Sequence, residues 1–129
     1  MNTTNFIDNK STDKNSVYFR SFDNVDVSER VKEKDLIEKI KTVHDPEIPV
    51  NIYDLGLVYK IEIDENNNII IKMTLTTPNC PVADSMPKKV GDSLIAIKGI
   101  KSIKVELVWN PPWTKDMMSD DAKLALDIV

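Results

Sequence analysis

The chain has 129 residues, of which 41% are hydrophobic and 29% charged, an ordinary composition for one globular domain. Its formal net charge of −4 argues against a general nucleic-acid binder, because neutralising phosphates needs a cationic surface. The sequence has no apolar run near the roughly 20 residues of a membrane helix and no secretory signal pattern, so we expect neither membranes nor nucleic acids among its partners.

Residues 1–28 are rich in Asn, Asp, Ser and Thr and have no sustained periodicity. So few apolar groups cannot offset the cost of ordering the backbone, which predicts a flexible N-terminal arm. The folded domain is expected over residues 29–129. Some apolar residues of the arm could instead dock on the domain or on a partner: Val17, Tyr18, Phe19 and Phe22.

Within the domain, the hydrophobic pattern changes from helical to strand spacing. Apolar residues three and four apart predict a helix over 30–43, with Ser28 available as its cap. Alternating apolar residues then predict strands, the first two joined by a hairpin loop at 64–68. The predicted strands span 57–63, 69–75 and 103–109.

A second helix is predicted over 82–97, between the second and third strands, with Gly99 as its terminator. Pro87 leaves open whether this helix is continuous or starts afresh there. A strand, a helix and a strand in this order favour a crossover joining parallel strands. Ser119 and the acidic residues after it predict a short final helix. The expected fold is a small α+β domain in α-β-β-α-β-α order, with a three-stranded mixed sheet and helices mainly on one face.

Cys80, the only cysteine of the chain, is the strongest candidate for chemistry. It stands where the second predicted helix begins, and Pro81 suits a first helical position. Free backbone N–H groups and the helix dipole would favour its thiolate, the form that ligates metal or attacks electrophiles. The alternative is a small buried hydrophobe. One cysteine forms no disulfide within the chain, which suits a reducing cytoplasm. With a single histidine it also makes no self-contained metal site.

A proline-rich loop before the first predicted strand carries the carboxylates of Asp45, Glu47 and Asp54. They could help bind metal, but Asp in such loops more often serves turn geometry. His44 could act as a base for Cys80, or its charge could simply favour the end of the preceding helix.

A stiff apolar loop follows the third predicted strand, with two tryptophans bracketing two prolines and two methionines after them. Trp and Met are enriched at interfaces, which favours a surface for docking a partner. The residues expected to dock it are Trp109, Pro112, Trp113 and Met117. A lid over the edge of the core is the equally weighted alternative.

These clusters occur in an order that resembles the SufT/PaaD-like family of metal–sulfur cluster assembly factors. The matching segments are DPEIP at 45–49, DLGLVY at 54–59, TLTTPNCP at 74–81, VWNPPW at 108–113 and MMSDDA at 117–122. The resemblance implies a compact iron–sulfur assembly-type α/β domain. The family's reactive cysteine falls on Cys80, its acidic positions on Asp45, Glu47 and Asp54, and a motif threonine on Thr76.

The resemblance further implies an accessory role, not an enzymatic one, in the SUF system of iron–sulfur cluster assembly. Cys80 would then ligate a transient iron–sulfur cluster, shared across a homodimer or with a small thiol or a client protein, since a cluster normally has four ligands. The expected partners are the assembly machinery and apo client proteins. Two alternatives stay open: a metal-free adaptor that docks clients through the loop at 109–118, and a cysteine-dependent enzyme that uses Cys80 with His44 or a carboxylate.

Overall fold

A computed structural model of the chain describes residues 17–46, 48–76 and 80–126, and for residues 80–84 it describes the backbone alone. These residues contain both strands and helices. In chain order they are β1 (Val17–Ser21), α2 (Glu33–Ile40), β2 (Val58–Ile63), β3 (Asn68–Met73), α3 (Cys80–Leu94), β4 (Ser102–Leu107), the 3-10 turn η1 (Lys115–Met117) and α4 (Asp120–Ala125).

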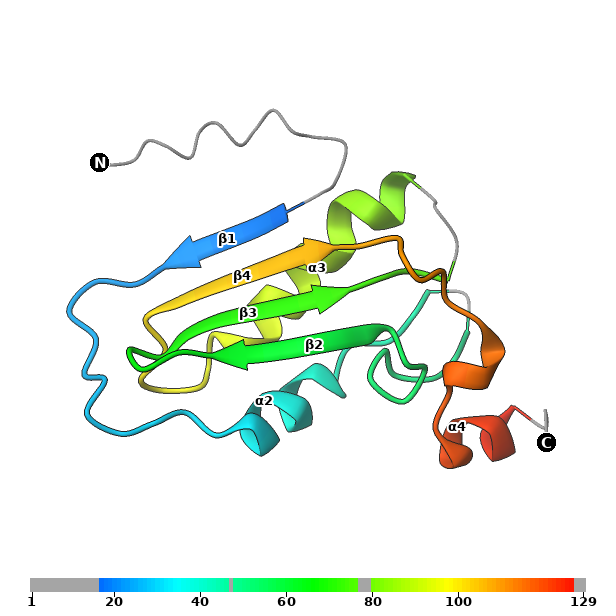
Figure 1. Ribbon diagram of the computed structural model, residues 1–129, viewed down its shortest axis with the longest axis horizontal. Helices are drawn as coiled ribbons and strands as arrows, with labels where there is room; N and C mark the ends of the chain where they lie inside the picture. Colours follow the sequence, from blue (N-terminus) through cyan, green and yellow to red (C-terminus); the bar gives the residue numbers. More distant parts are fainter. Residues whose placement is uncertain (1–16, 47, 77–79, 127–129) are drawn as a thin grey trace.

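The strands form one mixed sheet in the order β1-β4-β3-β2. β3 and β4 run parallel, with Ile69 opposite Ile103, and α3 connects them, so the predicted parallel pair is confirmed. β2 and β3 form the predicted antiparallel hairpin. Figure 1 shows α3 behind the sheet, where α2 packs against it. The small α+β class is therefore confirmed.

The prediction of three strands was wrong, because β1 adds a fourth strand at the edge beside β4. β1 lies inside the segment that the sequence predicts to be a flexible arm. It is held by Tyr18, whose ring packs against α3 at Gly91 and whose hydroxyl donates to Asp92 Oδ1 at 3.2 Å. Residues 1–16 lie outside the described residues, and the division of the chain at residue 28 stays a prediction.

The first predicted helix was too long at both ends, since α2 covers only Glu33–Ile40. Lys32 precedes its first turn and makes no side-chain cap. Ser28 is therefore not the cap; its backbone amide instead donates to Asp26 Oδ1 in an exposed turn. Instead, α2 is stabilised by charges that interact favourably with its dipole: acidic residues in its first turn and a lysine in its last turn.

The helix between β3 and β4 is continuous through Pro87, which answers the question that the proline left open. It ends at Leu94, earlier than predicted, and Gly99 with φ of +90° lies in a turn shortly before β4. The predicted cap of the final helix is confirmed, because Ser119 Oγ accepts a hydrogen bond from the Ala122 amide at 3.1 Å.

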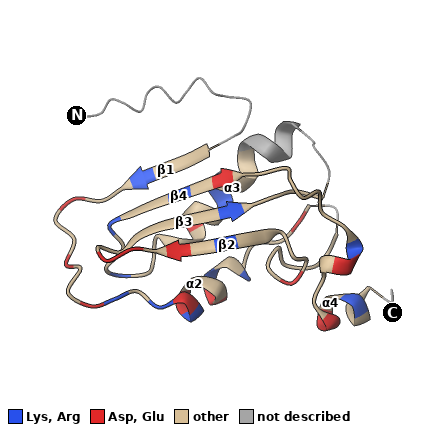
Figure 2. Ribbon diagram, viewed as in Figure 1, with Lys and Arg blue, Asp and Glu red and all other residues tan. Residues whose placement is uncertain are grey.

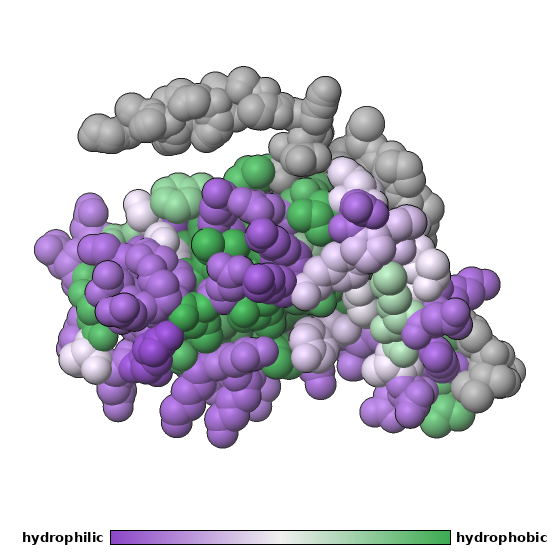
Figure 3. All heavy atoms as spheres, in the orientation of Figure 1, coloured by the Kyte–Doolittle hydropathy of each residue, from purple (hydrophilic) through white to green (hydrophobic). Residues whose placement is uncertain are grey.

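The core lies between the sheet and the helices, because alternate residues of β3 and β4 point toward α2 and α3. Its fully buried side chains include Ile69, Ile71, Met73, Ile103, Val105, Leu36, Ile40, Met86, Val90 and Leu94. The opposite face of the sheet is half exposed. It carries the ion pairs Lys60–Glu62 at 3.0 Å and Lys104–Glu106 at 2.9 Å, and charges of both signs are interspersed there (Figure 2). Hydrophilic and hydrophobic side chains are mixed on that face in Figure 3.

Among the described helices, none has the length and apolar character needed to span a membrane.

Candidate functional site

Cys80 is the first residue of α3, as the sequence predicts. β3 ends at Met73, and the connection contains buried Thr74 and Leu75 and half-buried Thr76. Residues 77–79 and the side chains of 80–84 lie outside the described part of the chain. Cys80 thus stands at the N-terminus of a long helix, where the backbone N–H groups of the first turn have no partner within the helix. Such a position favours a negatively charged ligand or thiolate.

The loop before β2 holds its two described carboxylates through backbone and amide contacts. Asp45 is only 6% exposed, and its Oδ2 accepts from the Ile48 amide at 2.8 Å. Asp54 Oδ2 accepts from Asn51 Nδ2 at 2.8 Å, and the Asp54 amide donates back to Asn51 Oδ1 at 2.9 Å. Glu47 lies outside the described residues. The described carboxylates therefore shape their loop, as the turn-geometry interpretation predicts.

Direct backbone contacts join this carboxylate loop to the other two clusters. The Thr74 amide donates to Leu57 O at 2.8 Å, which ties the loop to the segment that leads to Cys80. The Ser119 amide donates to Asp54 O at 2.8 Å, which ties it to the segment after β4. At Gly56 the backbone has a φ of +84°, and a Cβ there would overlap the Met117 backbone, so this close approach needs glycine.

The loop after β4 splits into a buried anchor and an exposed surface. Trp113 is half buried and its Nε1 donates to Leu55 O at 2.6 Å, so it holds the loop against the domain. Trp109 is 37% exposed, and Pro112 is exposed. Trp109 and Pro112 therefore offer more surface to a partner than Trp113 does.

Tyr59 is a residue that the sequence analysis did not single out. Its hydroxyl donates to Pro111 O at 2.7 Å and lies 3.5 Å from Met117 Sδ, and burial raises the pKa of Tyr59 above its ordinary value. Together with Gly56 and Val58, these residues line an open groove of about 480 Å³. The only sequence signal for it was the position of Tyr59 in the DLGLVY segment.

Thr74 is a second residue that the sequence patterns did not indicate, whereas the family motif pointed to Thr76. Its side chain is 1% exposed, and its Oγ1 has no hydrogen-bond partner among the described residues. His44 is exposed and forms a backbone bridge with Asn51. Its role as a base for Cys80 stays a prediction, because the Cys80 side chain lies outside the described part of the chain. Within the described ranges, no group of three or more His, Cys, Asp or Glu residues could hold a metal ion.

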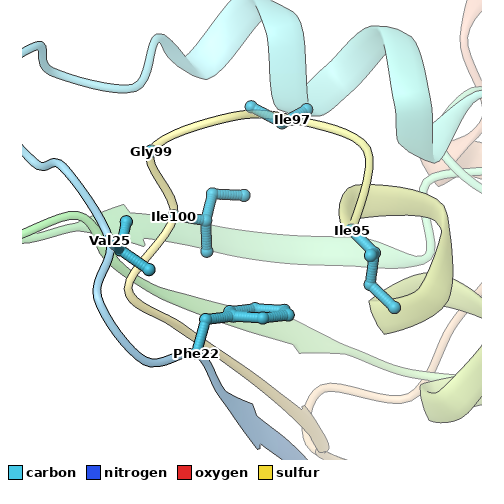
Figure 4. A pocket seen from close by; sticks show the side chains of 6 residues that line it. All are labelled: Phe22, Val25, Ile95, Ile97, Gly99 and Ile100. Atoms are coloured by element: carbon cyan, nitrogen blue, oxygen red, sulfur yellow. The ribbon is translucent and has the colours of Figure 1, made fainter.

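A smaller pocket of about 160 Å³ lies at the other end of the sheet, near the start of β4. Phe22, Val25, Ile95, Ile97, Gly99 and Ile100 line it, and Figure 4 shows the apolar side chains of Phe22, Ile95 and Ile100 turned toward it. Its lining offers no side-chain ligand for a metal.

Comparison with known proteins identifies the kind of domain to which this site belongs. A family model described as iron–sulfur cluster assembly protein matches residues 33–107. The chain is 46% identical over 94 residues to an Fe-S protein maturation auxiliary factor of Porphyromonas gingivalis, covering 73% of this chain and 90% of that protein. It is 41% identical over 100 residues to the Fe-S protein maturation auxiliary factor YitW of Bacillus subtilis, covering 78% and 98%.

Solved structures show the same fold. A domain of unknown function from Bacillus anthracis aligns with a TM-score of 0.70 at 44% identity, covering 75% of this chain and 92% of that one. A conserved hypothetical protein from Thermotoga maritima aligns with a TM-score of 0.66 at 36% identity, covering 77% and 97%. The family match spans more than half of the chain and includes Asp45, Asp54, Thr76 and Cys80. The chain belongs to the family of iron–sulfur cluster assembly proteins.

Proposed function

We propose that this protein is an accessory factor that holds an iron–sulfur cluster transiently and passes it to client proteins, with Cys80 as its ligand. The observation that carries the proposal is the position of Cys80: the sole cysteine is the first residue of α3 in a chain of this family. The names of the relatives agree with it. Besides the maturation factors, an iron-sulfur cluster carrier protein of Deinococcus radiodurans is 28% identical over 71 residues, which cover 20% of that protein.

Partial ligation suits a carrier. One thiolate leaves most positions of a cluster to other ligands, because clusters are normally held by four. A second subunit in a homodimer, a small thiol or the client would supply the rest, and replacing those ligands releases the cargo. Thr76 and the acidic loop of Asp45, Glu47 and Asp54 would support the segment around Cys80. The role needs no bond-making on a substrate, so it is not enzymatic, and a free thiolate implies a reducing cytoplasm.

Anaerobic reconstitution of the wild type and of Cys80→Ala tests the ligand directly. We expect the wild type to retain iron and sulfide after desalting and to pass them to an apo-ferredoxin, and Cys80→Ala to retain neither. Because the chain has one cysteine, no second thiol can replace Cys80. Thr42→Val, in the exposed turn after α2, is the matched control and should load like the wild type. If the wild type and Cys80→Ala retained equal amounts of iron and sulfide, the proposal would be wrong.

The mass of the loaded species tests the proposed homodimer. A cluster shared by two Cys80 thiolates predicts a dimer that forms on loading and returns to the monomer when a chelator removes the iron. Light scattering behind anaerobic size exclusion measures both states. A loaded monomer that contains a small thiol would contradict the homodimer and leave Cys80 as the single protein ligand.

An adaptor that docks clients without metal is the second candidate, and two observations favour it: Trp109 is exposed, and an open groove lies at Tyr59. Trp109→Ala should then weaken binding to an apo client, measured by titration calorimetry, while Cys80→Ala keeps it. Leu124→Ala is the control, since Leu124 is 67% exposed on α4, outside this loop. Trp113→Ala is a poor probe, because it removes the bond to Leu55 O that anchors the loop. Unchanged binding by Trp109→Ala argues against the adaptor.

A further inference from the structure

Thr74 contains a buried hydroxyl that the free protein does not use. The side chain is 1% exposed, and its Oγ1 is the one buried side-chain nitrogen or oxygen without a hydrogen-bond partner among the described residues. Burying a hydroxyl without a partner costs free energy, whereas a valine of nearly the same shape would fill the space without that cost. The hydroxyl therefore calls for a partner that the empty protein lacks.

Elsewhere the fold pairs its buried polar side chains. Asn67 is fully buried, and its amide group makes three hydrogen bonds, to Val31, Glu29 and Gly99. Asp45 accepts from the Ile48 amide. Thr74 is thus the exception among the buried polar side chains that the structure describes, and such a group in a native protein calls for an explanation, for example a catalytic role or an ion.

The position of Thr74 connects it to the candidate site. It is the first residue after β3, six residues before Cys80. Its amide donates to Leu57 O of the carboxylate loop, and the preceding residue, Met73, accepts at its carbonyl from the Val108 amide at the end of β4. The residue therefore lies where the three functional segments meet, and the segment that follows it leads directly to the cluster ligand.

We propose that Thr74 is a positioning residue for the cargo, whose hydroxyl donates a hydrogen bond to a sulfur of the iron–sulfur cluster when Cys80 ligates it. The inference rests on the proposed function and adds to it a second protein contact. Thiolate and sulfide sulfurs of clusters accept hydrogen bonds, which stabilise the bound form. The empty protein leaves the hydroxyl unpaired and the loaded protein pairs it, so the residue favours loading.

Thr74→Val tests this inference, because it removes the hydroxyl and keeps the shape. In the metal-free protein we expect the urea midpoint of Thr74→Val to equal or exceed that of the wild type. In the loaded protein we expect the variant to lose its cluster to a chelator about tenfold faster, the effect of one hydrogen bond to a charged acceptor. Thr74→Ser keeps the hydroxyl and should release at nearly the wild-type rate. Thr42→Val removes an exposed hydroxyl bonded to Lys39 O, and it should change neither the urea midpoint nor the rate of cluster release.

The outcomes separate this inference from the proposed function. If the wild type holds no more iron and sulfide than Cys80→Ala, the proposed function fails and the Thr74 inference falls with it. If the wild type holds a cluster and Thr74→Val releases it at the same rate, only the inference about Thr74 is overturned. A metal-free Thr74→Val that unfolds well below the wild-type midpoint would also overturn it, because the hydroxyl would then have a partner within the protein.

Discussion

Asn67 ties three distant segments together, and its replacement by alanine should destabilise the fold more than any surface change. The residue is fully buried in the β2–β3 hairpin, with a φ of +61°. Its Oδ1 accepts from the Val31 amide at 3.1 Å. Its Nδ2 donates to Glu29 O at 2.8 Å and to Gly99 O at 2.9 Å. Asn67→Ala removes all three bonds, of which the bond to Val31 is buried and those to Glu29 and Gly99 are part-buried.

The magnitude follows from these contacts. Each hydrogen bond contributes about 1 kcal/mol, and a buried partner left unpaired costs at least that much, which gives about 3 kcal/mol for the three. Alanine also tolerates the left-handed region less well than asparagine, which adds about 1 kcal/mol. The free energy of unfolding should therefore fall by about 4 kcal/mol, a large part of the roughly 5–15 kcal/mol that stabilises a domain.

Urea unfolding monitored by tryptophan fluorescence measures the effect. With a slope of about 2 kcal/mol per molar urea, the midpoint should move down by about 2 M. Asn67→Gly relieves only the backbone strain and should lose about 3 kcal/mol. Asn24→Ala is the matched control, because Asn24 has a φ of +55° but is exposed, and it should lose about 1 kcal/mol. An Asn67→Ala midpoint as close to the wild type as that of Asn24→Ala would refute the reasoning.

Other positions give sharp expectations. Gly91→Ala places a Cβ that overlaps the Tyr18 ring, so β1 should detach and its backbone amides should exchange faster. In the double variant with Tyr18→Ala, most of the stability loss caused by Gly91→Ala should disappear. If the stability losses of the two single variants simply added, the contact would be contradicted. Gly56→Ala should destabilise the fold, because of its positive φ and the Met117 carbonyl beside it. Burial raises the Tyr59 pKa above 10.0, so its contribution to stability is complete below pH 10 and is lost as the pH rises through the raised value. Phenolate absorbance of the wild type and Tyr59→Phe checks this, and a Tyr59 titrating at or below 10.0 argues against it.

The hydrophobic pattern predicted the elements better than it predicted their ends. Val31 and Val43 fit the helical spacing around α2 and are 7% and 8% exposed, yet both lie outside the helix. Val31 donates its amide to the Asn67 side chain instead. The spacing reports which side chains enter the core, whereas the helix ends where a backbone group finds a better partner. That partner is distant in the sequence and cannot be predicted from the local pattern.

β1 shows the same limit more strongly. Its five residues sit in a polar segment whose average composition indicates disorder, and the apolar Val17, Tyr18 and Phe19 are adjacent rather than alternating. The strand forms because β4 offers an edge and because Gly91 leaves room for the Tyr18 ring. The alternative that these residues dock on the domain agrees with the position of β1, but it did not predict that β4 is the strand they pair with.

The candidate site could be predicted cluster by cluster but not as a whole. Cys80 at a helix start and the turn-forming Asp45 and Asp54 follow from local residue types, whereas the residue types of the loop after β4 did not distinguish the exposed Trp109 from the anchoring Trp113. The contacts among the clusters, through Leu57 and Ser119, are backbone bonds without a side-chain signature. The unpaired hydroxyl of Thr74 is even less visible, because burial and the absence of a partner are properties of the folded chain.

The topology explains why the functional segments meet at one end of the sheet. β3 and β4 are parallel, so both deliver their carboxyl ends to the same edge, where ligands commonly bind in open sheets with helical crossovers. The end of β3 leads to Cys80, and the end of β4 leads to Trp109. β2 runs antiparallel to β3, so the segment before it, with Asp54 and Gly56, starts at that edge too. A hairpin with β2 shifted by one residue would keep every motif intact in the sequence, yet it would lose the Thr74–Leu57 backbone bond and turn the side chains of β2 to the other face of the sheet. The order of the motifs is therefore effective only through the register of these three strands.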